Sequence, residues 1–140
     1  MKSIASIAAS WEGTPFVPGA AIKGAGADCV HLAAEILREA GYEVRGVFPA
    51  YRCDAGDHTD IARLTDWLDA NEGFERLKLP AEIQSADLLC FRLGRVPHHV
   101  GVAIDQYRFV HVMRGYGTRI NDLRDSTYAR RFVAAYRPQP

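Results

Sequence analysis

The stretch Gly24-Ala25-Gly26-Ala27-Asp28-Cys29-Val30-His31-Leu32 joins a glycine-rich loop to the start of a helix. Asp28 is a residue type preferred at helix N-caps, which places Cys29 in the first turn, and Gly41 is typical just beyond a helix end. Unpaired backbone N–H groups and the helix dipole favour an anion at a helix start, so they lower the pKa of a thiol there. We therefore predict that Cys29 is a nucleophile. A free cysteine packed as a small hydrophobic residue is the alternative.

The base for this thiol has to come from outside the helix. At about 100° per residue, Cys29 shares an apolar face with Ile36, whereas His31 lies on the opposite, polar side. Cys29 and His31 therefore cannot form a catalytic pair.

Composition favours one globular domain over residues 1–140. The chain is 48% hydrophobic, and 17 Lys plus Arg balance 17 Asp plus Glu, so no basic field favours nucleic acid or a membrane surface. No apolar run near the N-terminus is long enough for a signal peptide or a membrane span, so we expect synthesis and folding in the cytoplasm. Cys29, Cys53 and Cys90 are an odd number without a C-x-x-C pair, which argues against a disulfide framework or a zinc ribbon.

Hydrophobic periodicity predicts helices in the first half of the chain and strands in the second. Helical spacing and capping residues indicate helices over 3–12, 29–40 and 60–71, while 41–58 has no clear period. From Asp87 onward, β-type runs between turns predict strands over 88–92, 99–104, 107–113, 118–120 and 131–137. This order indicates an α+β fold, with the N-terminal helices packed on a C-terminal antiparallel sheet.

Two histidines in these strands are the candidate partners of Cys29. His99 lies on a strand face of small residues, which would let the Cys29 helix approach it closely. A three- or five-residue loop centred on Asp105 would pair His99 directly with His111, at a Cβ separation of about 4.5–5.5 Å. A two- or four-residue loop would place the two rings on opposite faces. In the first case His99 acts as the base for Cys29 and His111 orients its ring. A hydrogen-bonded structural histidine is the alternative for each.

Six stretches carry further motif residues: 11–16 (WEGTPF), 23–29 (KGAGADC), 86–91 (ADLLCF), 99–104 (HVGVAI), 109–111 (FVH) and 131–138 (RFVAAYRP). In this order and combination they resemble the NlpC/P60 family of papain-like cysteine peptidases across nearly the whole chain. The resemblance assigns the family's catalytic cysteine, histidine and third polar residue to Cys29, His99 and His111. It implies a papain-like fold and hydrolysis of amide bonds in peptidoglycan stem peptides, commonly between D-γ-glutamyl and a diamino acid, without a metal or other cofactor.

The resemblance also indicates where the chain acts and where it departs from the family. The first two stretches are most similar to those of phage-tail-associated members, which implies action at the cell wall and phage tail proteins as partners. Phe16 stands where a tyrosine is common, and Ala86 stands where the family usually has glycine. We expect Phe16, Asp28 and Tyr51 on the substrate side of the site, with Tyr51 as a source of the hydroxyl that Phe16 lacks.

Other functions stay open on the sequence alone. A structural or tail-assembly protein would keep the fold without useful catalysis, and an acyltransferase or thioesterase would use the same cysteine and histidine. A zinc site made by Cys29, His99 and His111 is a further alternative.

Overall fold

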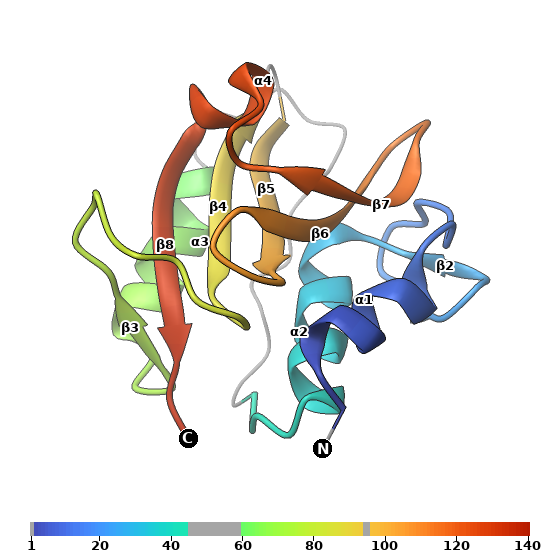
Figure 1. Ribbon diagram of the computed structural model, residues 1–140, viewed down its shortest axis with the longest axis horizontal. Coiled ribbons are helices and arrows are strands. Elements are labelled where there is room, and N and C mark those ends of the chain that lie inside the picture. Colours follow the sequence, from blue (N-terminus) through green and yellow to red (C-terminus); the bar gives the residue numbers. More distant parts are fainter. Residues whose placement is uncertain (1, 45–59, 94–95) are drawn as a thin grey trace.

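A six-stranded antiparallel sheet in the order β3-β8-β4-β5-β6-β7 organises the fold (Figure 1). The computed structural model describes residues 2–44, 60–93 and 96–140, with the backbone alone at 60–63, 93 and 96–98. The strands of the sheet are β3 (Phe74–Arg76), β4 (Leu88–Leu93), β5 (Val96–Ala103), β6 (Arg108–Met113), β7 (Gly117–Asp122) and β8 (Phe132–Pro138). The fold is therefore the predicted α+β arrangement, although β3 was not predicted.

The helices begin and end near the residues that the sequence indicates. They are α1 (Ile4–Trp11), α2 (Cys29–Glu39), α3 (Asp60–Ala70) and the short α4 (Ser126–Ala129), which was not predicted. Ser3 caps α1 by accepting a hydrogen bond from the backbone N–H of Ser6 at 3.1 Å. Beyond α2, Gly41 adopts φ +96°, and the N–H of Tyr42 donates to the carbonyl of Leu37 at 3.0 Å, as at many helix C-termini. Within the described part of the chain, none of these helices has the length and apolar character of a membrane span.

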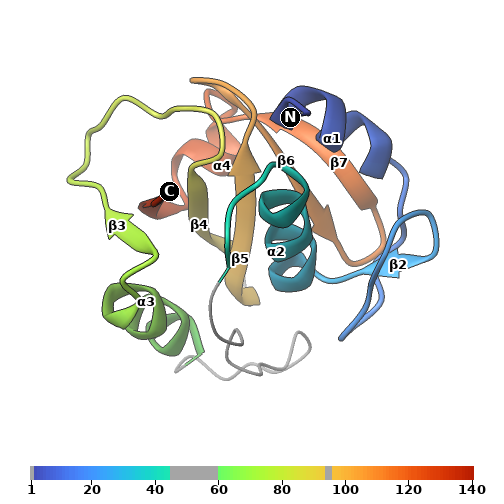
Figure 2. The same cartoon turned by 90° about the horizontal axis from the view of Figure 1, so that it is seen from below.

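The two faces of the sheet bury different sets of residues. One face packs against α1, α2 and α3, which Figure 2 shows beneath and beside the strands, and its core holds Val100, Val102 and Val110 from β5 and β6. The opposite face holds Phe91, Ala103 and Phe109, and Tyr128 from α4 packs against it. The expectation that the Cys29 helix covers the His99 face is therefore wrong, because α2 packs against the valines that alternate with that face.

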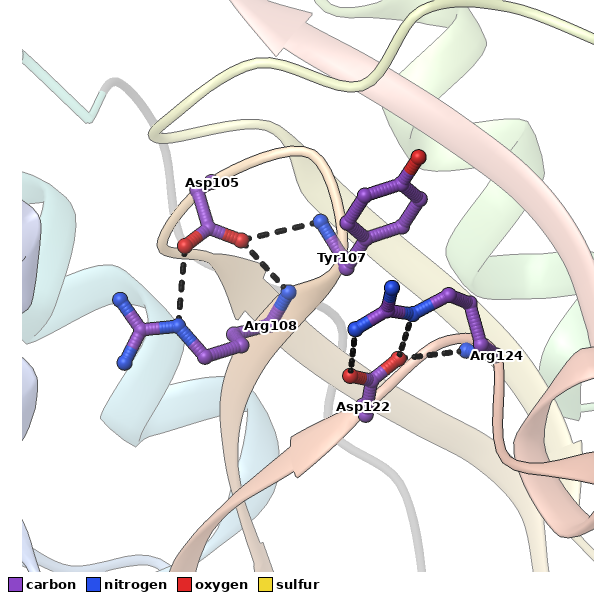
Figure 3. Close-up of polar contacts among 5 residues, drawn as sticks. All are labelled: Asp105, Tyr107, Arg108, Asp122 and Arg124. Atoms are coloured by element: carbon purple, nitrogen blue, oxygen red, sulfur yellow. Dashed lines mark hydrogen bonds and ion pairs between the residues drawn. The ribbon is translucent and has the colours of Figure 1, made fainter.

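The turn between β5 and β6 sets the register of the two histidine strands. Ala103 pairs with Phe109, and the N–H of Ile104 donates to the carbonyl of Arg108 at 2.8 Å, so the loop is centred on Gln106. Asp105 begins the turn: its carboxylate accepts from the N–H groups of Tyr107 and Arg108 at 3.0 and 2.8 Å and from the Arg108 guanidinium at 2.9 Å (Figure 3). The predicted centre at Asp105 is wrong by one residue.

The end of β7 lies beside this turn. Arg124 forms two hydrogen bonds with the carboxylate of Asp122, at 3.0 and 2.7 Å, and its guanidinium lies 4.0 Å from the centre of the Tyr107 ring (Figure 3). These exposed pairs tie the strand ends together, and solvent screening keeps their contribution to stability small.

The Gly-Thr-Pro stretch joins the loop before α2 to the far edge of the sheet. The carbonyl of Thr14 accepts from the N–H and the hydroxyl of Thr118 in β7, both at 2.9 Å. The Thr14 hydroxyl in turn accepts from the N–H of Gly24 at 2.9 Å. This loop also contains the small hairpin of β1 (Ala21–Ile22) and β2 (Gly26–Ala27). The loop before α2 is therefore held to β7 by hydrogen bonds of the backbone and of the two threonine hydroxyls.

Candidate active site

Cys29 is the first residue of α2 and is 3% exposed. Asp28 caps the helix, since its Oδ1 accepts from the N–H of His31 at 2.9 Å. The side chain thus satisfies one of the unpaired donors at the helix start and leaves the thiol in the first turn, as the sequence predicts.

Asp28 also holds the loop that precedes the helix. Its Oδ2 accepts from the N–H of Gly19 at 2.6 Å, and its Oδ1 lies 2.7 Å from Nδ1 of His31. Asp28 is only 3% exposed, and both of its carboxylate oxygens have partners within the chain, as buried polar atoms usually do. The observed role of Asp28 is to fix the start of α2, and its contact with a substrate stays a prediction.

His99 and His111 form a buried pair of rings. Nε2 of His99 lies 2.6 Å from Nδ1 of His111, the ring centres are 4.8 Å apart, and the planes are inclined by 74°. The two residues are 3% and 2% exposed. The structure therefore brings together two of the three residues predicted to form the site.

This contact arises from a register that differs from the predicted one. When the turn centre moves from Asp105 to Gln106, the β6 partner of each β5 residue shifts by two positions. Both histidine rings therefore stay on one face of the sheet, and His111 lies opposite Gly101. A Cβ at Gly101 would lie 2.8 Å from Phe109 Cδ2 and 3.4 Å from His111 Cβ. Glycine is needed here because the Phe109 ring, together with the Val110 carbonyl oxygen at 3.1 Å, occupies the space of a side chain.

The sheet splits beside the pair. In the described part of the chain, ladder pairing between β5 and β6 is confined to Val102–Val110 and Ala103–Phe109, and the two strands diverge beyond it (Figure 1). Helix α2 packs against both strands. His99 lies on β5 and His111 on β6, so the two rings come from opposite sides of the split.

Asn121 extends the pair, and sequence reasoning missed it. Its Oδ1 lies 2.7 Å from Nε2 of His111. Strand β7 pairs with β6 from Arg108–Asp122 to Met113–Gly117, which places Asn121 opposite Phe109 and diagonal to His111. The signal in the sequence was the same alternation that joined the histidines: once β6 and β7 are paired, Asn121 and His111 share a face.

An aromatic wall surrounds the His111 ring. Tyr128 meets it edge-on, with ring centres 5.3 Å apart and planes at 90°, and Phe109 lies 4.7 Å from it. Phe91 lies 5.9 Å from the ring of His99. These rings keep water from much of the pair.

Burial decides the charge state of both histidines. Desolvation, followed by the neighbouring His111, lowers the pKa of His99 well below its ordinary value. Desolvation lowers the pKa of His111 to about 4, although the hydrogen bond to Asn121 opposes the shift. Both rings are therefore neutral at neutral pH, which is the form that accepts a proton from a thiol.

The other predicted site residues give a mixed result. Phe16 forms an isolated parallel bridge with Ala27 and lies under the Arg114 guanidinium, 5.1 Å from its ring centre. Tyr51 and Cys53 lie outside the described residues. Cys90 is fully buried on β4, and desolvation raises the pKa of its thiol to about 12. Cys90 is therefore a core residue without thiolate character at neutral pH.

Two further features concern possible ligands of the site. Across residues 2–44, 60–93 and 96–140, no cluster of three His, Cys, Asp or Glu side chains has the grouping of metal ligands. His111 lines a pocket of about 240 Å³, and Tyr116, Arg119, Asn121 and Tyr128 contribute to its walls.

A six-stranded antiparallel sheet with a cysteine-bearing helix on one face and a buried histidine pair beside its split defines a protein of the α+β class. The chain belongs to the NlpC/P60 family, whose model matches residues 13–137. No curated protein sequence matches it.

Solved structures share the fold at low sequence identity. An NLP/P60 family lipoprotein-like protein from Staphylococcus aureus matches with a TM-score of 0.65 and 21% identity over 98% of this chain. An NlpC/P60 family protein from Bacillus cereus matches with a TM-score of 0.65 and 19% identity over 99% of this chain. This chain spans 40% of the length of each. The NlpC/p60 domain of the peptidoglycan hydrolase SagA matches with a TM-score of 0.60 and 14% identity over 96% of both chains.

Proposed function

We propose that the protein is a cysteine peptidase that hydrolyses amide bonds in peptidoglycan stem peptides. The observation that carries this proposal is the buried contact of 2.6 Å between His99 Nε2 and His111 Nδ1, beside the helix that begins with Cys29. Membership of the NlpC/P60 family supports the chemistry, and the fold shared with the NlpC/p60 domain of a peptidoglycan hydrolase supports the substrate class.

Cys29 and His99 meet at the split of the sheet in this proposal. Helix α2 packs against β5 and β6 on the valine face, whereas His99 projects toward the other face. Because the strands separate beyond Val102 and Val110, the thiol at the helix start can approach the imidazole through the opening. Nε2 of His99 is engaged by His111, so Nδ1 is the nitrogen that takes the thiol proton.

The reaction then follows the order of acyl transfer to a thiol. His99 accepts the Cys29 proton, and the sulfur attacks the scissile carbonyl while backbone N–H groups at the start of α2 stabilise the oxyanion. The carbon–nitrogen bond breaks as His99 returns the proton to the leaving amine. Water then adds to the thioester, gives its proton to His99 and releases the acid together with the Cys29 thiol. His111 holds the His99 ring in the orientation that these transfers need.

The preferred scissile bond is the one between D-γ-glutamyl and a diamino acid, which rests on the resemblance to the family. Phe16, Asp28 and Tyr51 line the substrate side in this proposal, and Arg114 on the Phe16 ring adds a cation near that loop. In this proposal the protein acts on the cell wall, and phage tail proteins are its candidate partners.

Muropeptides of known stem composition test the function directly. The wild-type protein should cleave them to fragments that mass spectrometry identifies by the new amine and acid, and Cys29→Ala should yield none. Cys90→Ala is the matched control, because the Cys90 thiol is fully buried and burial raises its pKa to about 12, so we expect a folded Cys90→Ala protein to keep cleaving. Cleavage by Cys29→Ala would exclude the mechanism, and transfer of the acyl group to an added amine instead of water would make the protein an acyltransferase.

A further inference from the structure

The contact between the two histidine rings continues to a third side chain. Nε2 of His111 lies 2.7 Å from Oδ1 of Asn121, and the other nitrogen of the same ring contacts His99. We propose that Asn121 is a positioning residue that fixes the tautomer of both imidazoles and so keeps Nδ1 of His99 available as the base. This inference rests on the proposed function and adds a fourth residue to it.

The argument follows the protons along the chain of contacts. An amide oxygen only accepts hydrogen bonds, so His111 carries its proton on Nε2 and offers the lone pair of Nδ1. Nε2 of His99 must then donate to that lone pair at 2.6 Å, which leaves the lone pair of His99 on Nδ1. Nδ1 is the nitrogen that the proposed mechanism needs to take the thiol proton.

The reverse orientation of the amide would defeat the base. If the Asn121 amide donated to His111, every proton along the chain would move to the other nitrogen, and His99 would carry hydrogen on Nδ1. A ring in that state cannot accept a proton from Cys29 at the same atom. The orientation of one neutral amide therefore decides whether the site has a base.

The fold holds Asn121 firmly at this position. β7 pairs with β6 at six successive positions, and the backbone of Asn121 pairs with Phe109 within that run. Tyr128 covers the His111 ring edge-on, and His111 and Asn121 both line the pocket beside it. Asn121 is thus supported on a regular strand and is half-buried.

The charges around the pair favour neutral rings that relay hydrogen bonds. His111 is faced by His99 from β5, by Arg119 from β7 and by Tyr128 from α4, and the guanidinium of Arg119 disfavours a positive charge on His111. No carboxylate contacts either ring among the described residues. Orientation of a neutral ring, rather than compensation of its charge, is therefore the role open to Asn121.

The tautomers can be observed without a substrate. Long-range proton–nitrogen NMR on protein with ¹⁵N-labelled histidine should show His99 and His111 both protonated on Nε2 at pH 7.5. A proton on Nδ1 of His99 in the wild-type protein would overturn the proposal.

Variants of Asn121 test the consequence for the thiol. We expect Asn121→Leu to slow alkylation of Cys29 by iodoacetamide at pH 6.5 by about tenfold, the size of one lost hydrogen bond. Asn121→Asp keeps an acceptor in place and should alkylate at least as fast as the wild-type protein. Ile120→Val, whose side chain packs in the core on the other face, is the control and should react at the wild-type rate.

The outcomes separate this inference from the proposed function. The positioning role is refuted if Cys29 of a folded Asn121→Leu protein is alkylated at the wild-type rate and the His99 tautomer is unchanged. This holds whether or not the protein cleaves muropeptides. If the tautomers and alkylation rates are as predicted but the wild-type protein does not cleave muropeptides, the role of Asn121 is supported and the proposed substrate is refuted.

Discussion

At the scale of single residues, we expect the thiols of Cys29 and Cys90 to differ in reactivity because their surroundings differ. Cys29 begins α2, where backbone N–H groups and the helix dipole favour a thiolate, whereas Cys90 lies within β4 with no exposed surface. Burial raises the pKa of Cys90 to about 12, so almost none of it is ionised at neutral pH.

Alkylation should therefore separate the two thiols. In a Cys53→Ser background, native protein at pH 7.5 should take up one iodoacetamide, which peptide mass spectrometry locates at Cys29. Cys90 should react only after unfolding in denaturant. Modification of Cys90 in the native state, or an unreactive Cys29, would contradict this account of the two environments.

Residue chemistry on its own indicated Cys29, His99 and His111 as candidate site residues but did not indicate Asn121. The first three carry functional groups whose place in the sequence is informative: a thiol after a helix cap and two rings at matching strand positions. Asn121 is polar, common and located at the end of a predicted strand, so only the pairing of β6 with β7 reveals that it contacts His111. Its role is a tertiary property.

At the scale of the elements, local signals predicted the helices and most of the strands. Ser3 and Asp28 cap α1 and α2 as their side chains predict, because a cap depends on residues within one turn. The three residues of β3 and the four of α4 gave no such pattern. Their lengths are too short for a hydrophobic period to appear.

The register between β5 and β6 was predicted wrongly from the sequence. Asp105 sits in the loop, but its carboxylate binds the N–H groups of Tyr107 and Arg108, which makes it the first loop residue and not the central one. A shift of one residue in the centre moves the partner by two, so the face of His111 was predicted correctly and its direct partner was not.

Gly101 gives a test of this register. A methyl group there would overlap Phe109, so we expect Gly101→Ala to lower the free energy of unfolding by about 1–3 kcal/mol in urea titrations. Adding Phe109→Leu should relieve the overlap, and the double variant should lose less stability than the two single losses added together. Strictly additive losses would show that Gly101 does not face Phe109.

For the whole molecule, the buried histidines couple folding to pH. A histidine has a pKa of about 6.5 in the unfolded chain, whereas His111 has a pKa of about 4 in the fold. Between these values the unfolded chain binds more protons, so stability is full above pH 6.5 and is lost as the pH falls toward 4. The loss due to His111 amounts to about 3 kcal/mol when complete.

Thermal unfolding across this range checks the coupling. The melting temperature of the wild-type protein should fall steeply between pH 6.5 and pH 4, and His111→Leu should show a shallower fall because one titrating ring is gone. Parallel curves for the two proteins would mean that His111 is not held neutral by the fold.

At the scale of the whole molecule, the proposed mechanism draws on three regions beside the opening between β5 and β6. In that proposal the start of α2 supplies the thiol, β5 supplies the base, and β6 with β7 supplies the side chains that orient it. This mechanism requires β5 and β6 to separate beyond their turn, and hydrophobic alternation does not predict such a separation. Through the opening, a thiol on the helix that covers the valine face can approach a ring on the other face.

The specificity constant of His99→Gln toward a defined muropeptide tests this arrangement most directly, with His111→Gln measured beside it. We predict that His99→Gln lowers kcat/KM by about 1,000-fold, the contribution of a general base, while His111→Gln lowers it less because only ring orientation is lost. Cleavage by folded His99→Gln at the wild-type rate would contradict the account.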